Sequence, residues 1–109
     1  MTSYIDTHIH LDHLNELGPQ LDEARAAGIA TWIVPGVSPE GWPELMALTA
    51  KHAGVYAAPG IHPQAADRCQ LLPLKQLRLH LQHPKAVALG EVGLDRQVES
   101  SWQKQEETF

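Results

Sequence analysis

The most constraining feature of this sequence is a regular alternation of strand-like and helix-like segments. Strand-like segments begin at intervals of about 25–30 residues. They cover residues 4–10, 30–34, 55–58 and 85–89, and the last is apolar on both faces, as in a strand buried between layers. Strand–helix units of this length imply parallel pairing with right-handed crossovers. The sequence therefore predicts an α/β fold with about four parallel strands, in either a doubly wound sheet or a (β/α)₈ barrel.

Helix signals fill the intervals between these segments. Apolar residues at three- and four-residue spacing over residues 14–28 predict the first helix. Ser38-Pro39 provides an N-cap and a first-turn proline for a second helix, which carries its apolar stripe over residues 42–49. The leucine-rich stretch 73–82 predicts a third helix.

The length of the chain limits how much of such a fold it can form. The chain has 109 residues, whereas a complete barrel typically needs about 250. Ser100 and Gln103 form a possible capping box for a last helix, which stops after about two turns. We expect residues 1–109 to form one incomplete domain, truncated after the start of the helix that follows the fourth strand. A frayed terminal helix is the alternative.

Composition excludes several classes of protein. With 8 Lys and Arg against 13 Asp and Glu, the net charge is −5, and no basic cluster could hold duplex DNA by charge alone. No apolar run is long enough to span a membrane, and the N-terminus does not resemble a signal peptide. The single cysteine, Cys69, excludes an internal disulfide and fits a reducing compartment. We therefore expect a cytoplasmic protein without a membrane partner.

A His-x-His pair at the end of the first predicted strand suggests a metal site. Alternate strand residues share a face, with Cα atoms roughly 6.5–7 Å apart, so His8 and His10 could bind one divalent cation. Asp6 shares this face one step deeper and could orient a ligand. The residues of the other face, 5, 7 and 9, suit packing against helices. The alternative is two polar residues at a strand end without a metal.

Glu91 strengthens the metal interpretation. It follows the fourth predicted strand in the segment 90–95, so its carboxylate should reach the same rim of a parallel sheet as His8 and His10. Gly90 and Gly93 would allow a tight turn around it. A carboxylate between two metals can hold a dinuclear site, although the segment could also be a simple turn.

Two other histidines lie near this rim. His62 follows the third predicted strand and could contact a substrate oxyanion or hold a water molecule. A hydrogen bond within its own loop is an equal alternative. His13 lies past the end of the first strand, and we do not expect it to be a ligand.

Three segments in this order and spacing, 5–12, 60–63 and 90–95, closely resemble the TatD-type metal-dependent deoxyribonucleases of the amidohydrolase-like superfamily. The resemblance runs from Tyr4 to Phe109. It implies the N-terminal half of a TIM-type (β/α)₈ barrel, with two divalent metals, Mg, Mn or Zn, in the complete site. The implied substrate is DNA or another phosphodiester, which a metal-activated water attacks.

The resemblance also implies a role for each matching residue. His8 and His10 would bind the first metal, and Glu91 would bridge both metals as a ligand and catalytic residue. His62 would support catalysis, and Asp6 and Asp95 would lie in supporting positions around the ligands.

The chain departs from the family because it lacks two later histidines and an aspartate. We therefore expect weak or no hydrolysis by this chain alone. One alternative is a non-catalytic, metal-binding half-barrel that pairs through its exposed sheet edges with a second copy or another half. Another is a hydrolase of lactones or amides, because such metals also polarise carbonyl groups.

Overall fold

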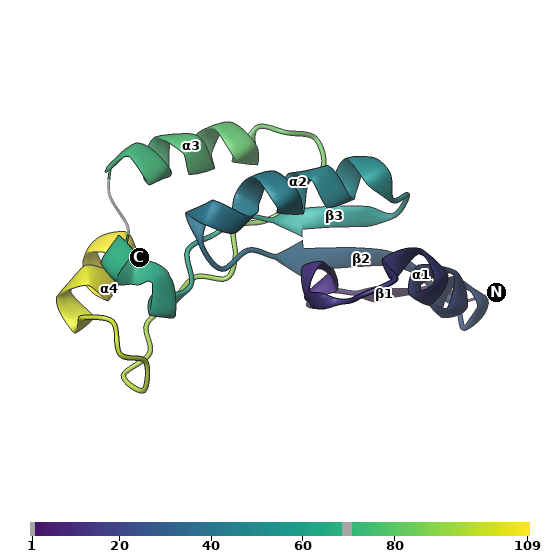
Figure 1. Ribbon diagram of the computed structural model, residues 1–109, viewed down its shortest axis with the longest axis horizontal. Coiled ribbons are helices and arrows are strands. Elements are labelled where there is room, and N and C mark those ends of the chain that lie inside the picture. The colour runs from purple at the N-terminus through teal and green to yellow at the C-terminus, as the bar shows by residue number, and fades with distance from the viewer. Residues whose placement is uncertain (1, 69–70) are drawn as a thin grey trace.

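A parallel sheet forms the centre of the molecule in the computed structural model, which describes residues 2–68 and 71–109 (Figure 1). Within these ranges the sheet has three strands in the order β1-β2-β3, and both neighbouring pairs are parallel. The strands are β1 (Tyr4–Asp6), β2 (Ile29–Pro35) and β3 (Val55–Ala58). Because all three run the same way, their carboxyl ends lie at one edge of the sheet. The predicted α/β class is confirmed.

Helices connect the strands and follow the sheet. The α-helices are α1 (Leu17–Ala26), α2 (Trp42–Lys51), α3 (Leu71–Leu81) and α4 (Trp102–Thr108), and the 3-10 turns are η1 (Leu11–His13), η2 (Pro39–Gly41) and η3 (Pro63–Arg68). Helix α1 packs on β2, and α2 packs on β3. Helix α4 lies beside η3, near the carboxyl ends of the strands (Figure 1). Among the described helices, none is both long and apolar enough to cross a membrane. Cys69 lies outside the described residues.

The main core joins one face of the sheet to the first two helices. Trp32 and Val34 alternate along β2 and are both fully buried, because residues two apart on a strand share a face. The other buried members of this cluster come from η1, α1, α2 and β3: Leu11, Leu21, Leu45, Val55 and Ala57. A second cluster of Trp42, Ile61, Ala65 and Leu77 attaches α3 to α2 and η3.

Strand β1 is shorter than the sequence suggests. It ends at Asp6, so the predicted strand 4–10 is wrong beyond that residue. The Asp6 carboxylate accepts a hydrogen bond from the backbone N–H of His8 (3.1 Å), and this local turn replaces the regular ladder. The predicted packing of its odd-numbered residues against helices also fails in part. Ile9 reaches the core, but Ile5 is 59% exposed.

Residues 85–89 do not form the predicted fourth strand. They make one parallel bridge, between Ala57 and Ala86, with hydrogen bonds from Ala57 N–H to Lys85 O and from Val87 N–H to Ala57 O (both 2.9 Å). Only β3 lies beside them among the described residues, so they are bonded on one side. Val87 and Leu89 are therefore about half exposed rather than buried on both faces.

The cap of α4 is displaced by one residue from the predicted capping box. Ser101, not Ser100, is the N-cap, and its hydroxyl accepts the Lys104 N–H (3.2 Å). Ser100 is instead buried and donates its hydroxyl to the Pro63 carbonyl. The buried Gln105 side chain donates to the carbonyl and the hydroxyl of Ser100, and so connects α4 to the residue before its N-cap. Ser38 likewise makes no side-chain capping bond, although it stands at the N-cap of η2.

Leu21 provides a test of this core. Leu21 is 1% exposed and packs from α1 into the main core. Leu21→Ala should therefore lower the free energy of unfolding by about 2–5 kcal/mol. Urea denaturation followed by circular dichroism measures this change. Leu14→Ala is the matched control, because Leu14 is 40% exposed and should change stability by no more than about 0.5 kcal/mol. Equal effects of the two substitutions would contradict the assigned core.

Candidate metal centre

Side chains from three loops meet at the carboxyl edge of the sheet. His8 and His10 follow β1, His62 follows β3, and Glu91 follows the bridged segment beside β3. In Figure 1 this edge is the end toward which the strand arrows point. The rim predicted from the sequence therefore does collect these four residues, even though β1 is short and the fourth strand is absent from the described chain.

The Glu91 carboxylate lies at the centre of this group. Its Oε2 is 3.2 Å from His10 Nε2, and its Oε1 is 3.9 Å from both His8 Nε2 and His62 Nε2. One potential ligand atom from each of His8, His10 and Glu91 lies within 4.8 Å of the others. The side chain of His8 is 58% exposed, whereas those of His10, His62 and Glu91 are between 24% and 29% exposed. The group is thus open to solvent on the His8 side.

The donor set of this group fits a divalent cation. Two imidazole nitrogens and a carboxylate oxygen are typical ligands of Zn²⁺ and related transition metals, whereas Mg²⁺ prefers oxygen alone. The His8 and His10 rings meet edge to face, with centroids 5.3 Å apart. Both Nε2 atoms can therefore face the same carboxylate without the rings overlapping.

A close crossing of three backbone segments fixes Glu91. Its N–H donates to Gly36 O (2.7 Å), and the Gly36 N–H donates to Gly90 O (3.0 Å) and Ala58 O (2.8 Å). A Cβ on Gly60 would lie 2.5 Å from the carbonyl carbon and oxygen of Gly90, so only glycine allows this approach. Sequence reasoning missed Gly36, and it named Gly60 within the segment 60–63 without assigning it a structural role. The repeated Pro-Gly pair at the ends of the second and third strands was the available signal.

His62 is oriented by its own loop. Its Nδ1 accepts the backbone N–H of Gln64 (3.1 Å), and its backbone N–H donates to Val37 O (2.8 Å). Because Nδ1 is an acceptor, the neutral ring carries its proton on Nε2, the atom that faces Glu91. This arrangement presents a hydrogen-bond donor to the centre.

The two predicted supporting carboxylates act locally in the structure. Asp6 bonds the His8 backbone, as described above, and so shapes the loop that carries both histidines. The Asp95 carboxylate accepts the Gln97 N–H (2.8 Å), and its backbone is bonded to the Gln105 side chain. Asp95 is not part of the ligand groups found among the described residues. Its role at the centre stays a prediction.

Asp12 is a further residue near the centre, and the sequence patterns did not single it out. His10, Asp12 and His13 also bring potential ligand atoms within 4.8 Å of one another. The His13 ring stacks on the His10 ring, with centroids 5.1 Å apart and planes 12° apart. His13 itself is 67% exposed.

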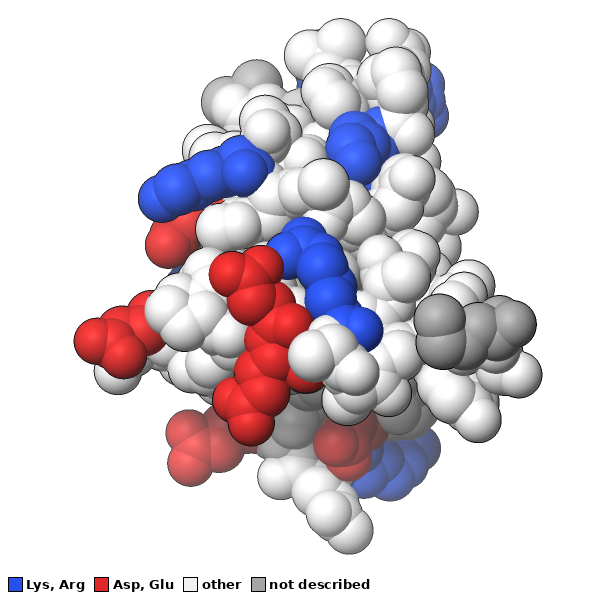
Figure 2. Space-filling view, turned by 90° about the vertical axis from the view of Figure 1, so that its right-hand side faces the viewer, with Lys and Arg blue, Asp and Glu red and all other residues white. Residues whose placement is uncertain are grey.

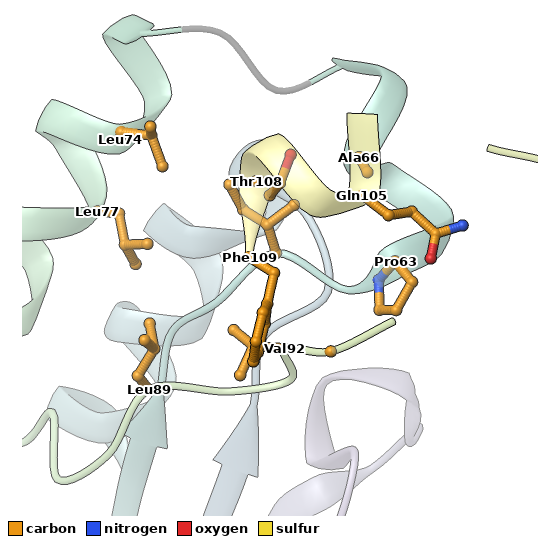
Figure 3. A pocket seen from close by; sticks show the side chains of 11 residues that line it. Pro63, Ala66, Leu74, Leu77, Leu89, Val92, Gln105, Thr108 and Phe109 are labelled. Atoms are coloured by element: carbon orange, nitrogen blue, oxygen red, sulfur yellow. The ribbon is translucent and has the colours of Figure 1, made fainter. Parts of the chain in front are cut away.

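The described residues form several hollows near this end of the molecule. One of about 370 Å³ borders Asp12 and His13. An open hollow of about 440 Å³ borders His8 and Glu91 at the uncovered face of the sheet. A smaller cavity of about 80 Å³ lies between α3, α4 and residues 89–93, with Leu74, Leu77, Val92 and Phe109 around it (Figure 3). Its lining is apolar, and the polar atoms of Gln105 are already hydrogen-bonded, so it is packing space rather than a reactive site.

At the opposite end of the molecule, the described residues form no group of potential metal ligands. In Figure 2 its basic side chains are separated by uncharged surface and acidic side chains lie beside them. One such pair is Arg25 and Asp22, 2.9 Å apart on α1. The described basic side chains of this face form no continuous surface.

Gly60 provides a direct test of the backbone crossing. Gly60→Ala should force the Gly90–Glu91 segment away and lower the affinity for Mn²⁺ by at least about tenfold, because the carboxylate then misses the histidines. Isothermal titration calorimetry measures this affinity. Gly41→Ala is the control, since a Cβ there meets nothing within 4 Å. Equal Mn²⁺ affinities for the two variants would contradict the proposed constraint.

Comparisons with known proteins point to one family. The family model described as TatD related DNase matches residues 5–109. An uncharacterized metal-dependent hydrolase, YjjV of Escherichia coli, is 36% identical over 97 residues, which cover 84% of this chain and 38% of that protein. The 3'-5' ssDNA/RNA exonuclease TatD of Cronobacter turicensis is 32% identical over 89 residues, covering 82% of this chain and 33% of that protein.

A solved structure extends the likeness to the fold. The crystal structure of the TatD homologue YjjV from Escherichia coli superposes with a TM-score of 0.84 at 32% identity, over 96% of this chain and 43% of that chain. The chain thus spans between a third and two fifths of the length of these curated relatives. On the family match and the sequence identity together, the chain belongs to the TatD family of metal-dependent hydrolases.

Proposed function

We propose that residues 1–109 supply the first metal site of a phosphodiesterase centre that acts on single-stranded DNA or RNA. The observation that carries this proposal is the convergence of His8, His10 and His62 on one carboxylate, Glu91. The class of substrate is supported by relatives whose names describe 3'-5' ssDNA/RNA exonucleases. The open side of the centre, next to the exposed His8, would admit a single strand.

Each residue would have a distinct role. His8 and His10 would hold one divalent cation, Mg, Mn or Zn, and Glu91 would bind it and use its second oxygen for another. Bound there, such a cation supplies Lewis acidity toward a phosphate oxygen and a water molecule. His62, with its proton on Nε2, would donate a hydrogen bond to a phosphate oxygen. Asp6 would keep the histidine loop in place, and Asp95 would support the loop after Glu91.

The extent of the domain bears on activity. We propose that residues 1–109 are one part of a barrel domain, in keeping with the fraction of the solved relative that they cover. The resemblance assigns two further histidines and an aspartate of the complete site to strands that come later than residues 1–109. Hydrolysis by residues 1–109 alone should therefore be weak or absent.

A cytoplasmic location stays a prediction from the single cysteine.

The Glu91 carboxylate is the most direct test of this function. Glu91→Gln removes the negative charge at the point where three imidazoles meet, so the Mn²⁺ affinity should fall by more than about tenfold. Titration calorimetry with Mn²⁺ measures it, and Glu23→Gln on the exposed side of α1 is the matched control. A 3'-labelled single-stranded oligonucleotide then reports nuclease activity with Mn²⁺ or Mg²⁺.

The outcomes separate the proposal from an artefact. Residual nuclease activity that is lost in both His8→Ala and Glu91→Gln supports the centre. Activity that is unchanged in both variants would mean a contaminating nuclease. If Glu91→Gln bound Mn²⁺ with the affinity of the wild type, the proposal of a metal centre at Glu91 would be contradicted.

A second candidate function rests on the edges of the sheet. Strand β1 and the segment 85–89 are each bonded to one neighbour only among the described residues, and Val87 and Leu89 are half exposed. Such edges favour pairing with another chain. The chain would then be a metal-binding half-barrel that pairs with a second copy or with another half.

Light scattering after size exclusion tests this pairing. A dimer that Val87→Lys converts to a monomer, while Leu79→Lys on exposed α3 does not, would support it, because a charge on the bridged edge opposes strand addition. A monomer at all concentrations would exclude self-pairing.

A further inference from the structure

Two buried polar atoms beside the candidate centre have no hydrogen-bond partner among the described residues. They are Nδ1 of His10 and Oδ1 of Asp12. A buried polar atom without a partner is destabilising, so such atoms are rarely left unused. One is a ring nitrogen that can donate a proton, and the other is a carboxylate oxygen that can accept it.

The rest of the His10 ring is already engaged. Nε2 faces Glu91 Oε2 at 3.2 Å, the edge of the His8 ring meets it on one side, and His13 stacks on its face. Only the Nδ1 position remains available to fix the rotation of the ring about its bond to the chain. Asp12 belongs to η1, the turn that starts immediately after His10.

One oxygen of the Asp12 carboxylate contacts His13, and the other has no partner among the described residues. Asp12 Oδ2 lies 3.8 Å from His13 Nε2, and this leaves Oδ1 as the oxygen without a partner. The carboxylate makes no capping bond to η1, whose N-cap is His10. His10, Asp12 and His13 each bring one potential ligand atom within 4.8 Å of the others, so the Asp12 carboxylate lies close to the His10 residue. A small side-chain rotation or one bridging water can then join the carboxylate to the ring.

We propose that Asp12 is a positioning residue for the metal ligand His10. Its carboxylate accepts the Nδ1–H of His10, directly or through one water, and so leaves the Nε2 lone pair facing the cation. A metal-bound histidine commonly donates its other ring proton to a carboxylate in this way, which fixes the tautomer and raises the basicity of the ligand. The inference rests on the metal centre proposed above and adds to it the group that selects the tautomer.

Metal affinity gives the first test, with Zn²⁺ alone as the probe. Asp12→Ala removes the acceptor and should lower the Zn²⁺ affinity measured by calorimetry by about 10–100-fold. Asp12→Asn keeps an acceptor oxygen without the charge and should lose less. Asp22→Ala and Asp22→Asn are the matched controls, because Asp22 is 78% exposed on α1, away from the centre, and should leave the affinity unchanged.

The tautomer of His10 gives a readout that a merely structural role would not move. In the Zn²⁺-bound wild type, long-range ¹H–¹⁵N spectra should show His10 protonated at Nδ1, with a downfield, slowly exchanging proton. Asp12→Ala should lose this proton signal to exchange, whereas Asp12→Asn should retain it at a smaller downfield shift. If Asp12→Ala does not fold, Asp12→Asn carries the test through its shift and its intermediate affinity.

Each outcome decides a separate claim. Wild-type affinity in Asp12→Ala, or an unchanged Nδ1 proton signal in either Asp12 variant, would overturn the role of Asp12 and leave the metal centre intact. Failure of the wild-type chain to bind Zn²⁺, or equal Zn²⁺ affinity in the wild type and His10→Ala, would overturn the metal centre and the role of Asp12 with it.

Discussion

The close contact of three glycine-containing backbone segments is the constraint on which the candidate centre depends. Gly36 bonds both Gly90 O and the Glu91 N–H, and Gly60 leaves the space in which they meet. These bonds join the ends of β2 and β3 to the segment that carries Glu91. The backbone of Glu91 is thereby held in place, although its segment is only weakly paired with the sheet. The chemistry of the side chains depends on hydrogen bonds that involve no side chain.

The distribution of burial follows from the same architecture. Helices α1 and α2 cover one face of the sheet, and the buried residues of β2 alternate toward them. The other face remains open, with Ile5 and Val87 exposed and the hollow beside His8 and Glu91 at its edge. In the barrel domain proposed above, these positions would line the inner face. The centre therefore lies where the uncovered face meets the carboxyl rim.

Sequence patterns predicted what depends on local periodicity and on strand direction. The bounds of β3, the parallel order and the meeting of His8, His10 and Glu91 at one rim all follow from these two properties. The patterns failed where a single hydrogen bond decides between alternatives. Asp6 ends β1 early by bonding the His8 backbone, and Ser100 bonds Pro63 instead of capping α4. Segment 85–89 has strand-like residues, but a strand also needs neighbours, which local sequence does not reveal.

The strand order places the residues of the candidate centre at opposite edges of the sheet. His8 and His10 extend from β1 at one edge, and Glu91 extends from the segment bridged to β3 at the other, so β2 and β3 lie between them. A cation shared by these side chains would link the two margins of the sheet. Ligand binding to the folded state alone raises its stability by mass action. Cation binding and folding of the sheet would then be coupled, and a chelator would lower the stability of the folded chain.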